Sequence, residues 1–396
     1  MPDDQPFPPS NVTASGAVAV WPRLLGIDVL RGIAASLVFL IHFVGYLNTG
    51  GDPAQSWEKI VAVPIFLGSI GTNLLLLLCG FMISRSLTKP RFHYWGFLQD
   101  RVIRIYLPYC LVIALALLFW RVFPAFAKVS PHSIDLPYVI KQFVFIPGLF
   151  PGHPVLTVSW TLSIIFPAYC LCPLIAIAYR RLFCLATGSL LSLWLLLLLL
   201  CLSCALCWPA IPVRICYIPL GCAVAEWFLA ARPSTLSRRR ILLLLLAAAL
   251  ALLFRYWLSE NRLLLNLPYR EYTLLYWSFG AAATTIGTSL AVLTSPDHSR
   301  RWFQLPLLGL LLLGQRGYSF YLLHGPITKI GTFYLGWLCT GAASAVALAL
   351  FCFSCSLLAA HLMFLFVEIR LAGCIRSMLP SSHTTASLSL LSQPTG

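Results

Sequence analysis

Long apolar stretches recur along the whole chain, and the short segments between them carry most of the charged residues. Ten of these stretches hold about 20 residues each, the helical length that crosses a hydrocarbon core about 30 Å thick. They cover residues 25–47, 62–87, 102–120, 155–179, 182–207, 211–231, 239–257, 271–294, 315–336 and 338–367. The pattern predicts an all-α, polytopic integral membrane protein with about ten transmembrane helices.

Two further segments depart from this pattern. Residues 302–313 form a shorter apolar run after two arginines, which favours an interfacial position over a spanning one. Residues 131–154 are rich in Pro and Gly, as expected of an ordered loop or re-entrant element. The expected organisation is a cytoplasmic N-terminal tail, a transmembrane domain and a disordered, Ser/Thr-rich cytoplasmic tail, at residues 1–22, 23–370 and 371–396. The polar, Pro-rich start lacks a basic n-region, so no cleavable signal peptide is expected.

Composition supports a membrane protein and excludes a water-soluble one. Apolar residues make up 59% of the chain and charged residues only 10%, with a mean hydropathy of +0.86, whereas a soluble domain carries about 25% charged residues. The net charge of +15 fits basic cytoplasmic loops better than a nucleic-acid partner. With the N-terminus inside, the inner segments hold 17 basic residues and the outer segments nine, with Arg31 inside a span. Both termini are therefore expected in the cytoplasm.

The 14 cysteines lie mostly within apolar runs. Cys201, Cys204 and Cys207 share one run, and Cys352 and Cys355 share another. This spacing suits thiolate ligands of a metal ion. No histidine or carboxylate lies in either local cluster, so the cysteines are interpreted as small apolar residues of packed helices, and no metal site is predicted.

The first apolar stretch contains two side chains that are suited to binding or catalysis, Arg31 and His42. They are 11 residues apart, so on a helix they face nearly the same direction about 16 Å apart. A guanidinium matches phosphate oxygens, and a neutral imidazole is suited to act as a general base near pH 7. The alternative is a packing role, with Arg31 paired to Asp28 and His42 bonded to a neighbouring carbonyl. The residues alone leave both readings open.

Other polar groups lie near the ends of later stretches. From the end of the second stretch to the start of the third, the chain carries Arg85, Lys89, Arg91, Arg101 and Arg104. Such a charge cluster attracts an acidic cytosolic ligand such as a nucleotide-bearing cofactor, although it also serves to orient the chain in the membrane.

Two of the later stretches also carry polar side chains. On the ninth, Tyr321 and His324 lie one turn apart on one face. Trp160 and Ser163 open the fourth, where a tryptophan is also a common interfacial anchor.

Together, these segments resemble the acyltransferase type 3 family, ten-span membrane enzymes that O-acylate carbohydrates. The resemblance runs from about residue 24 to residue 369 in family order. The matching segments are Ile27–Ala35 with His42, Gly80–Phe81, Arg101 and Arg104 before Pro108, Trp160 with Leu162, Ser163, Tyr169 and Pro173, Tyr318–His324, and Val367–Glu368. Two positions depart from the family pattern: Ile165 replaces a usual glutamate, and Cys79 replaces a common serine.

The resemblance implies transfer of an acyl group, most simply acetyl, from cytoplasmic acyl-CoA to a hydroxyl of a surface carbohydrate or glycolipid. It implies a bacterial inner membrane and no tightly bound cofactor. The implied roles are catalysis by His42, as base or acyl carrier, with Arg31; binding of the CoA phosphates by Arg101, Arg104 and Arg85; and contact with the acceptor by Trp160, Ser163, Tyr321 and His324.

Two alternatives remain at this stage. A transporter or flippase of a sugar or lipid-linked intermediate would move its substrate without acyl-CoA. The second alternative is that the protein is a family member that has lost activity. Only Ile165 supports it, and restoring glutamate at that position should then raise activity. The acceptor, the acyl length and the oligomeric state are left open.

Overall fold

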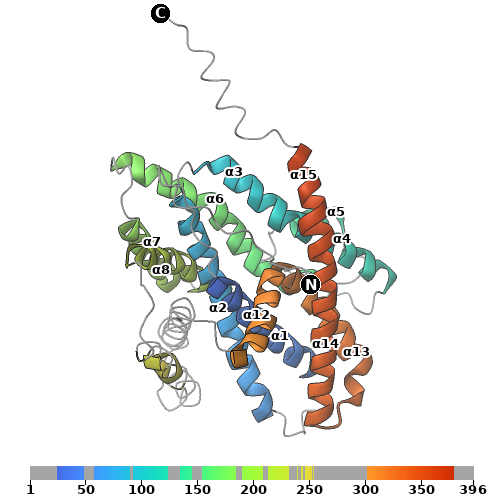
Figure 1. The fold of residues 1–396 in the computed structure, drawn as a ribbon. Coiled ribbons are helices and arrows are strands. Elements are labelled where there is room, and N and C mark those ends of the chain that lie inside the picture. Colours follow the sequence, from blue (N-terminus) through green and yellow to red (C-terminus); the bar gives the residue numbers. More distant parts are fainter. Residues whose placement is uncertain are drawn as a thin grey trace, which may run out of the picture.

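The structure is a computed structural model (Figure 1). It describes residues 25–48, 58–89, 92–123, 134–144, 154–183, 190–207, 213–231 and 301–378, with a few positions between 239 and 253. Every regular element within these residues is a helix, which confirms the all-α prediction. The predicted span 271–294 lies outside the described residues, as does about half of 239–257.

Five helical segments of the described chain are long and apolar enough to cross a membrane. They are Gly26–Leu47, Ile70–Leu87, Tyr94–Val122, Ser159–Leu182 and Ala342–Met378. Apolar side chains cover much of their outer surface, because lipid takes the place of water around them. The chain is therefore a membrane protein, while its full number of spans stays a prediction.

The helices follow the predicted stretches closely. In order they are α1 (Leu25–Asn48), α2 (Glu58–Leu87), α3 (Tyr94–Arg101), η1 (Val102–Tyr106), α4 (Leu107–Val122), α5 (Leu136–Phe143), α6 (Ser159–Leu182), α7 (Leu191–Cys207), η5 (Val213–Cys216), α8 (Tyr217–Ala231), α12 (Arg301–Gln315), α13 (Gly317–Leu335), η7 (Gly336–Leu338), α14 (Ala342–Met363), η8 (Phe364–Leu371) and α15 (Ala372–Met378). The segment predicted as a Pro/Gly-rich loop contains the short helix α5. The run at 302–313 is α12, which packs against α1.

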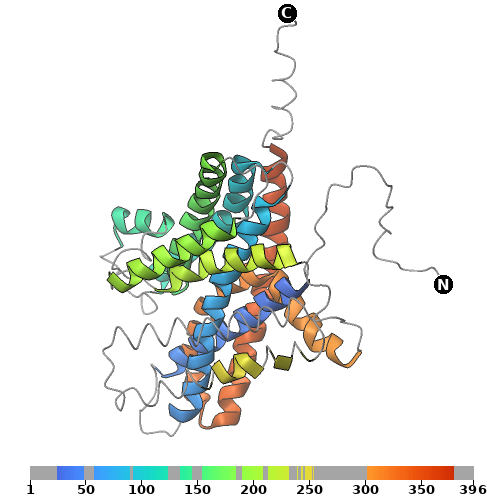
Figure 2. The ribbon, with the colours of Figure 1, turned by 90° about the vertical axis from the view of Figure 1, so that its left-hand side faces the viewer.

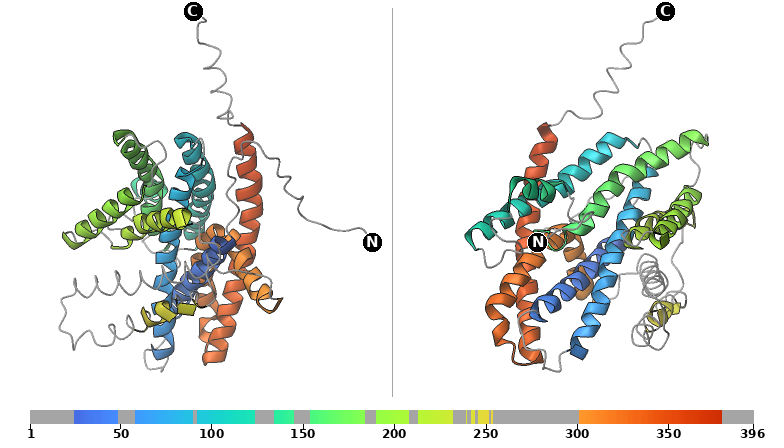
Figure 3. Two further views of the ribbon diagram at one scale, coloured as in Figure 1. Left: turned by 60° about the vertical axis from the view of Figure 1, so that its left-hand side comes forward. Right: turned by 180° about the vertical axis from the view of Figure 1, so that it is seen from behind.

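Helix α1 lies at the centre of the contacts that matter for the site. It packs against α2, α12 and α13, while α13 also packs along α14 and α2 packs against α8. Figure 2 shows α1 crossing α2 at an angle, and the right-hand view of Figure 3 places α14 and the α7–α8 pair on opposite sides of α2. This arrangement brings α1 and α13 together inside the bundle.

Two long helices contain a π-helical turn. In η1 the backbone N–H of Leu107 donates to the carbonyl of Val102, five residues earlier. Pro108 follows directly, and proline supplies no N–H and crowds the carbonyl four residues before it, which favours a wider turn. The second π-helical segment, η8, joins α14 to α15. The third predicted span therefore begins at Tyr94 rather than near residue 102.

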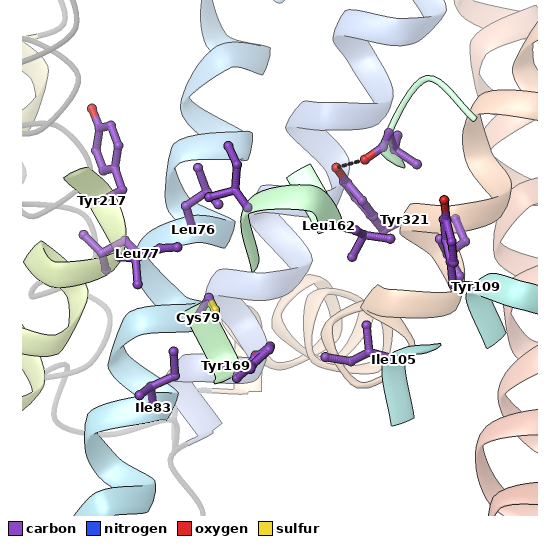
Figure 4. Packing of buried hydrophobic residues seen from close by; sticks show 14 of the residues in the cluster. Leu76, Leu77, Cys79, Ile83, Ile105, Tyr109, Leu162, Tyr169, Tyr217 and Tyr321 are labelled. Atoms are coloured by element: carbon purple, nitrogen blue, oxygen red, sulfur yellow. Dashed lines mark hydrogen bonds between the residues drawn. The ribbon is translucent and has the colours of Figure 1, made fainter. Parts of the chain in front are cut away.

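An apolar core joins α2, α4, α6, α8 and α13 (Figure 4). Leu77 from α2, Tyr109 from α4 and Leu162 from α6 are each at most 2% exposed. The Tyr109 hydroxyl donates to the Gln142 carbonyl of α5 at 2.6 Å, which ties that short helix to the core. The core thus fixes the relative positions of the helices that carry the candidate site residues.

Helices α2 and α8 cross at two glycines, Gly80 and Gly221. A Cβ at Gly80 would collide with the Ile218 carbonyl, and a Cβ at Gly221 would collide with the Leu77 carbonyl. Small residues allow such close backbone approach between membrane helices. The Gly80–Phe81 motif of the sequence therefore has a packing role.

Candidate active site

Two histidines from different helices meet inside the bundle. His42 on α1 and His324 on α13 have ring centroids 5.2 Å apart, with planes inclined by 46°. His42 is half-buried, and His324 is completely buried. The sequence placed both residues in the site through separate motifs, and the fold brings them into contact.

The hydrogen bond of His324 defines which of its nitrogens can accept a proton. Its Nδ1 lies 3.0 Å from the Phe320 carbonyl oxygen, and a carbonyl only accepts, so Nδ1 carries the hydrogen. In the neutral ring Nε2 then keeps its lone pair. Nε2 is buried without a hydrogen-bond partner in the described structure. Since an unsatisfied buried acceptor is costly, this atom is suited to receive a hydrogen bond from a ligand.

Tyr321 and Thr161 form the wall next to the histidine pair. The Tyr321 ring centroid is 5.9 Å from that of His324, one turn along α13. Its hydroxyl is hydrogen-bonded to Thr161 and donates to the Val158 carbonyl at 3.2 Å (Figure 4). Tyr321 therefore joins α13 to the start of α6. Thr161, which lies next to Trp160, was not singled out by the sequence.

The two other predicted acceptor residues have different surroundings. Trp160 carries the guanidinium of Arg214 over its ring, 5.0 Å from the centroid. Ser163 is fully buried and donates to the carbonyl of Ser159, one turn earlier in α6. Arg214 also acts electrostatically on Tyr321. It is a cation near the site that sequence reasoning missed, because it precedes α8, far from the motifs.

Three arginines, from α1 and from the helix that continues from α3 through η1, interact electrostatically. Arg31 pairs with Asp28 at 3.3 Å and interacts electrostatically with Arg101 and Arg104. Arg101 lies over the rings of Phe97 and Tyr169, with centroid distances of 5.0 and 5.2 Å. Its Nε is buried without a hydrogen-bond partner in the described structure. We call Arg31, Arg101 and Arg104 the arginine cluster.

The cluster suits a polyanionic ligand. Guanidinium groups match phosphate oxygens in pairs of hydrogen bonds, and like charges held together favour an incoming anion. Arg85, also predicted to bind the cofactor, lies in the last turn of α2.

The late Tyr–Ser motif links α13 to the π-helical turns. Tyr318 donates to the Ile105 carbonyl of η1 at 2.6 Å, and Ser319 donates to the Glu368 carboxylate of η8. Glu368 also interacts electrostatically with Arg104. The carboxylate belongs to the closing Val367–Glu368 element, but the sequence had not predicted that it lies beside the arginine cluster.

The arginine cluster and the histidine pair lie at different depths of the same bundle. Arg31 precedes His42 by 11 residues of continuous helix, which is about 16 Å of rise. Tyr318 contacts η1 near the cluster, and His324 follows it by six residues of α13. Ile165, which replaces the usual family glutamate, packs against the apolar core.

The match to known families agrees with this geometry. Residues 24–367, which are most of the chain, match the model of the acyltransferase domain family, the type 3 acyltransferases. Comparison with curated proteins and with solved structures finds no match. This protein belongs to the acyltransferase type 3 family and is a membrane acyltransferase.

Proposed function

We propose that this protein transfers an acyl group, most simply acetyl, from cytoplasmic acyl-CoA to a hydroxyl of a carbohydrate or glycolipid at the opposite face of a bacterial inner membrane. The observation that carries the proposal is the His42–His324 contact, with ring centroids 5.2 Å apart, at a different depth from the arginine cluster. Family membership favours transfer over transport, because the family is one of acyltransferases.

The arginine cluster binds the phosphates of the donor. Arg101 and Arg104 follow the α2–α3 connection, and Arg31 adds a third guanidinium from α1. The pantetheine arm of CoA then extends between the helices toward His42. The separation of about 16 Å between the two groups of residues suits a long, flexible arm that carries its thioester at the end. Binding and orientation of this arm bring the thioester to the histidine pair.

At the histidine pair, His42 acts as a general base. It accepts the proton of the acceptor hydroxyl while that oxygen attacks the thioester carbonyl and forms the new ester. The carbon–sulfur bond breaks, and the CoA thiolate leaves with the proton from the His42 imidazolium. His324, whose Nε2 faces no described hydrogen-bond partner, receives a hydrogen bond from the acceptor and positions it. General-base catalysis contributes about 10²–10⁴-fold to such a reaction.

The test compares three histidine variants of the purified protein in detergent. His42→Ala should lower the release of CoA from acetyl-CoA by about 10²–10⁴-fold in the presence of acceptor. His324→Phe keeps an aromatic ring but removes Nε2, and should lower the rate by about tenfold for one lost neutral hydrogen bond. The control, His361→Ala, removes a histidine on α14 that contacts Arg316 and should leave the rate near wild type.

Host-glycan mass spectrometry provides the second readout. Ester groups should disappear from the surface glycans of cells that carry His42→Ala in place of the wild-type protein. Unchanged O-acylation at normal protein levels would refute the assignment of His42. Substrate movement without CoA release would instead support the transporter alternative.

A further inference from the structure

A large apolar pocket lies next to the histidine pair. It has a volume of about 480 Å³ and is lined by α4, by residues 155–157 and by α13, with Tyr46 of α1 at its edge. Most of its lining is apolar, including Leu115, Leu118 and Trp120. Its size falls within the usual range for small-molecule sites. Neither the proposed base nor the arginine cluster lines this pocket, so it needs an occupant of its own.

The pocket lies beyond the histidine pair, away from the arginine cluster. On α1 the order is Arg31, His42 and then Tyr46, which lines the pocket. On the continuous helix from α3 to α4, Arg104 comes first and the pocket residues begin at Val112. On α13, the lining runs from Leu323, next to His324, to Ile330. A donor held at the arginine cluster therefore reaches the histidines at the near side of the pocket without filling it.

The pocket opens toward the lipid. Leu118 and Val122 in its lining are 63% and 61% exposed on a helix long and apolar enough to span the membrane. Phe123, at the end of α4, is 46% exposed. Exposed apolar side chains on such a helix face acyl chains rather than water. An apolar chain can therefore enter the pocket sideways from the bilayer.

Polar groups lie where the pocket approaches the histidines. Tyr46 stacks on His42 with centroids 6.1 Å apart, and its hydroxyl is hydrogen-bonded to Thr157 at 2.7 Å. Lys329 is the only cation among the pocket-lining residues. Thr328, next to it on α13, is fully buried, and its hydroxyl has no hydrogen-bond partner in the described structure. The pocket thus has an apolar body with one cation in its lining, and a buried hydroxyl without a described partner lies beside that cation.

We propose that this pocket binds the acceptor, and that the acceptor is a lipid-linked sugar phosphate. Its apolar chain occupies the pocket, its phosphate binds Lys329, and its sugar hydroxyl lies against His42 and His324. The chemistry fits because a phosphate that joins a long chain to a sugar places the anion between the apolar and hydroxyl-bearing parts. This inference rests on the proposed acyl transfer and specifies its acceptor.

The test measures binding separately from catalysis. The probe is glucosyl dodecyl phosphate, compared with dodecyl glucoside, which lacks the phosphate, and glucose 1-phosphate, which lacks the chain. Glucosyl dodecyl phosphate is expected to bind the full-length protein in lipid nanodiscs. Dodecyl glucoside should bind about tenfold more weakly, because a charge-assisted hydrogen bond is lost. Glucose 1-phosphate should show little binding.

Two alanines on α4 provide matched variants. Ala116 lines the pocket, whereas Ala114 is exposed and is not among the lining residues. Ala116→Trp should fill the pocket and weaken binding of the phosphate probe by about tenfold or more, and Ala114→Trp should leave it unchanged. Lys329→Met should remove the preference for the phosphate probe over dodecyl glucoside, and Lys329→Arg should restore it.

Several results would overturn the proposal. Equal binding to both Trp variants would show that the chain does not occupy this pocket. Equal affinity of wild type for the two dodecyl probes would exclude an anionic acceptor. Competition by phosphatidylglycerol as strong as by the sugar probe would assign the pocket to a structural lipid. If the wild-type protein releases CoA in a His42-dependent manner but does not bind glucosyl dodecyl phosphate, the proposed acyl transfer stands and this inference alone is refuted.

Discussion

At the scale of single residues, the site depends on two nitrogens that the fold leaves without partners. The Nε2 of His324 and the Nε of Arg101 are both buried and have no hydrogen-bond partner in the described structure. Buried polar atoms are rarely left this way in folded proteins. One belongs to the proposed acceptor site and the other to the proposed donor site, so each is explained by a ligand that completes it.

A prediction at this scale concerns the donor. Arg101→Ala should raise the KM for acetyl-CoA by about tenfold, because one charged hydrogen-bonding group is lost, with a smaller effect on kcat. Steady-state release of CoA by the purified variant measures both constants. Arg376→Ala is the control, since this exposed arginine pairs with the exposed side chain of Asp100 at 2.7 Å, and exposed ion pairs contribute little to stability. A KM equal to that of wild type in Arg101→Ala would remove this residue from the donor site.

The sequence indicated individual candidate residues but not their partners. Arg31, His42 and His324 each stand in a local motif, so they could be selected as candidates from the sequence, and their roles stay predictions. Thr161 and Arg214 act through contacts with residues that are distant in the sequence. Without an alignment, no local pattern distinguishes a serine, threonine or arginine that makes such a contact from one that does not.

At the scale of elements, close helix crossings decide where the site residues lie. Hydropathy predicted α1, α2, α6 and α13 nearly within their observed limits, because membrane spans need a run of about 20 apolar residues. It missed the start of α3 at Tyr94 and the π-helical turn in η1, because neither feature changes the average hydropathy of a window. Side-chain hydrogen bonds and the proline at 108 define them instead.

The α2–α8 crossing gives a prediction about stability. Gly80→Ala should lower the thermal stability of the protein by an amount that corresponds to about 1–3 kcal/mol, because its Cβ would meet the Ile218 carbonyl. Gly373→Ala is the matched control, since a Cβ there meets no atom within 4 Å. Fluorescence-detected size-exclusion chromatography after heating measures both. Equal melting temperatures for the two variants would contradict the close approach of the α2 and α8 backbones at Gly80.

At the scale of the whole molecule, the bundle has two distinct ends. Figure 1 shows α3 and α15 at one end, where Arg376 pairs with Asp100, and the turn between α13 and α14 at the other. The arginine cluster lies toward the first end and the pocket toward the second. Under the proposed function, the first end faces the cytoplasm and the second faces outward.

Cysteine labelling tests this orientation. Lys89 and Thr340 are both exposed and lie in turns at the two ends. Thr340→Cys should react with a membrane-impermeant maleimide in intact cells, and Lys89→Cys should react only after permeabilisation. The parent protein, with its own cysteines, gives the background. Labelling of both positions from the same side would contradict the predicted sidedness.

The π-helical turn in η1 sets the rotation of α4 relative to α3 about the axis of their common helix. Such a turn contains one residue more than an α-helical turn, so it rotates everything that follows by about 100° relative to an uninterrupted helix. Adding a single residue after Tyr106, with no second wide turn to absorb it, would leave Arg101 in place but turn Leu115 and Leu118 away from Tyr46. An insertion there would separate donor recognition from acceptor recognition without altering any side chain that contacts either molecule.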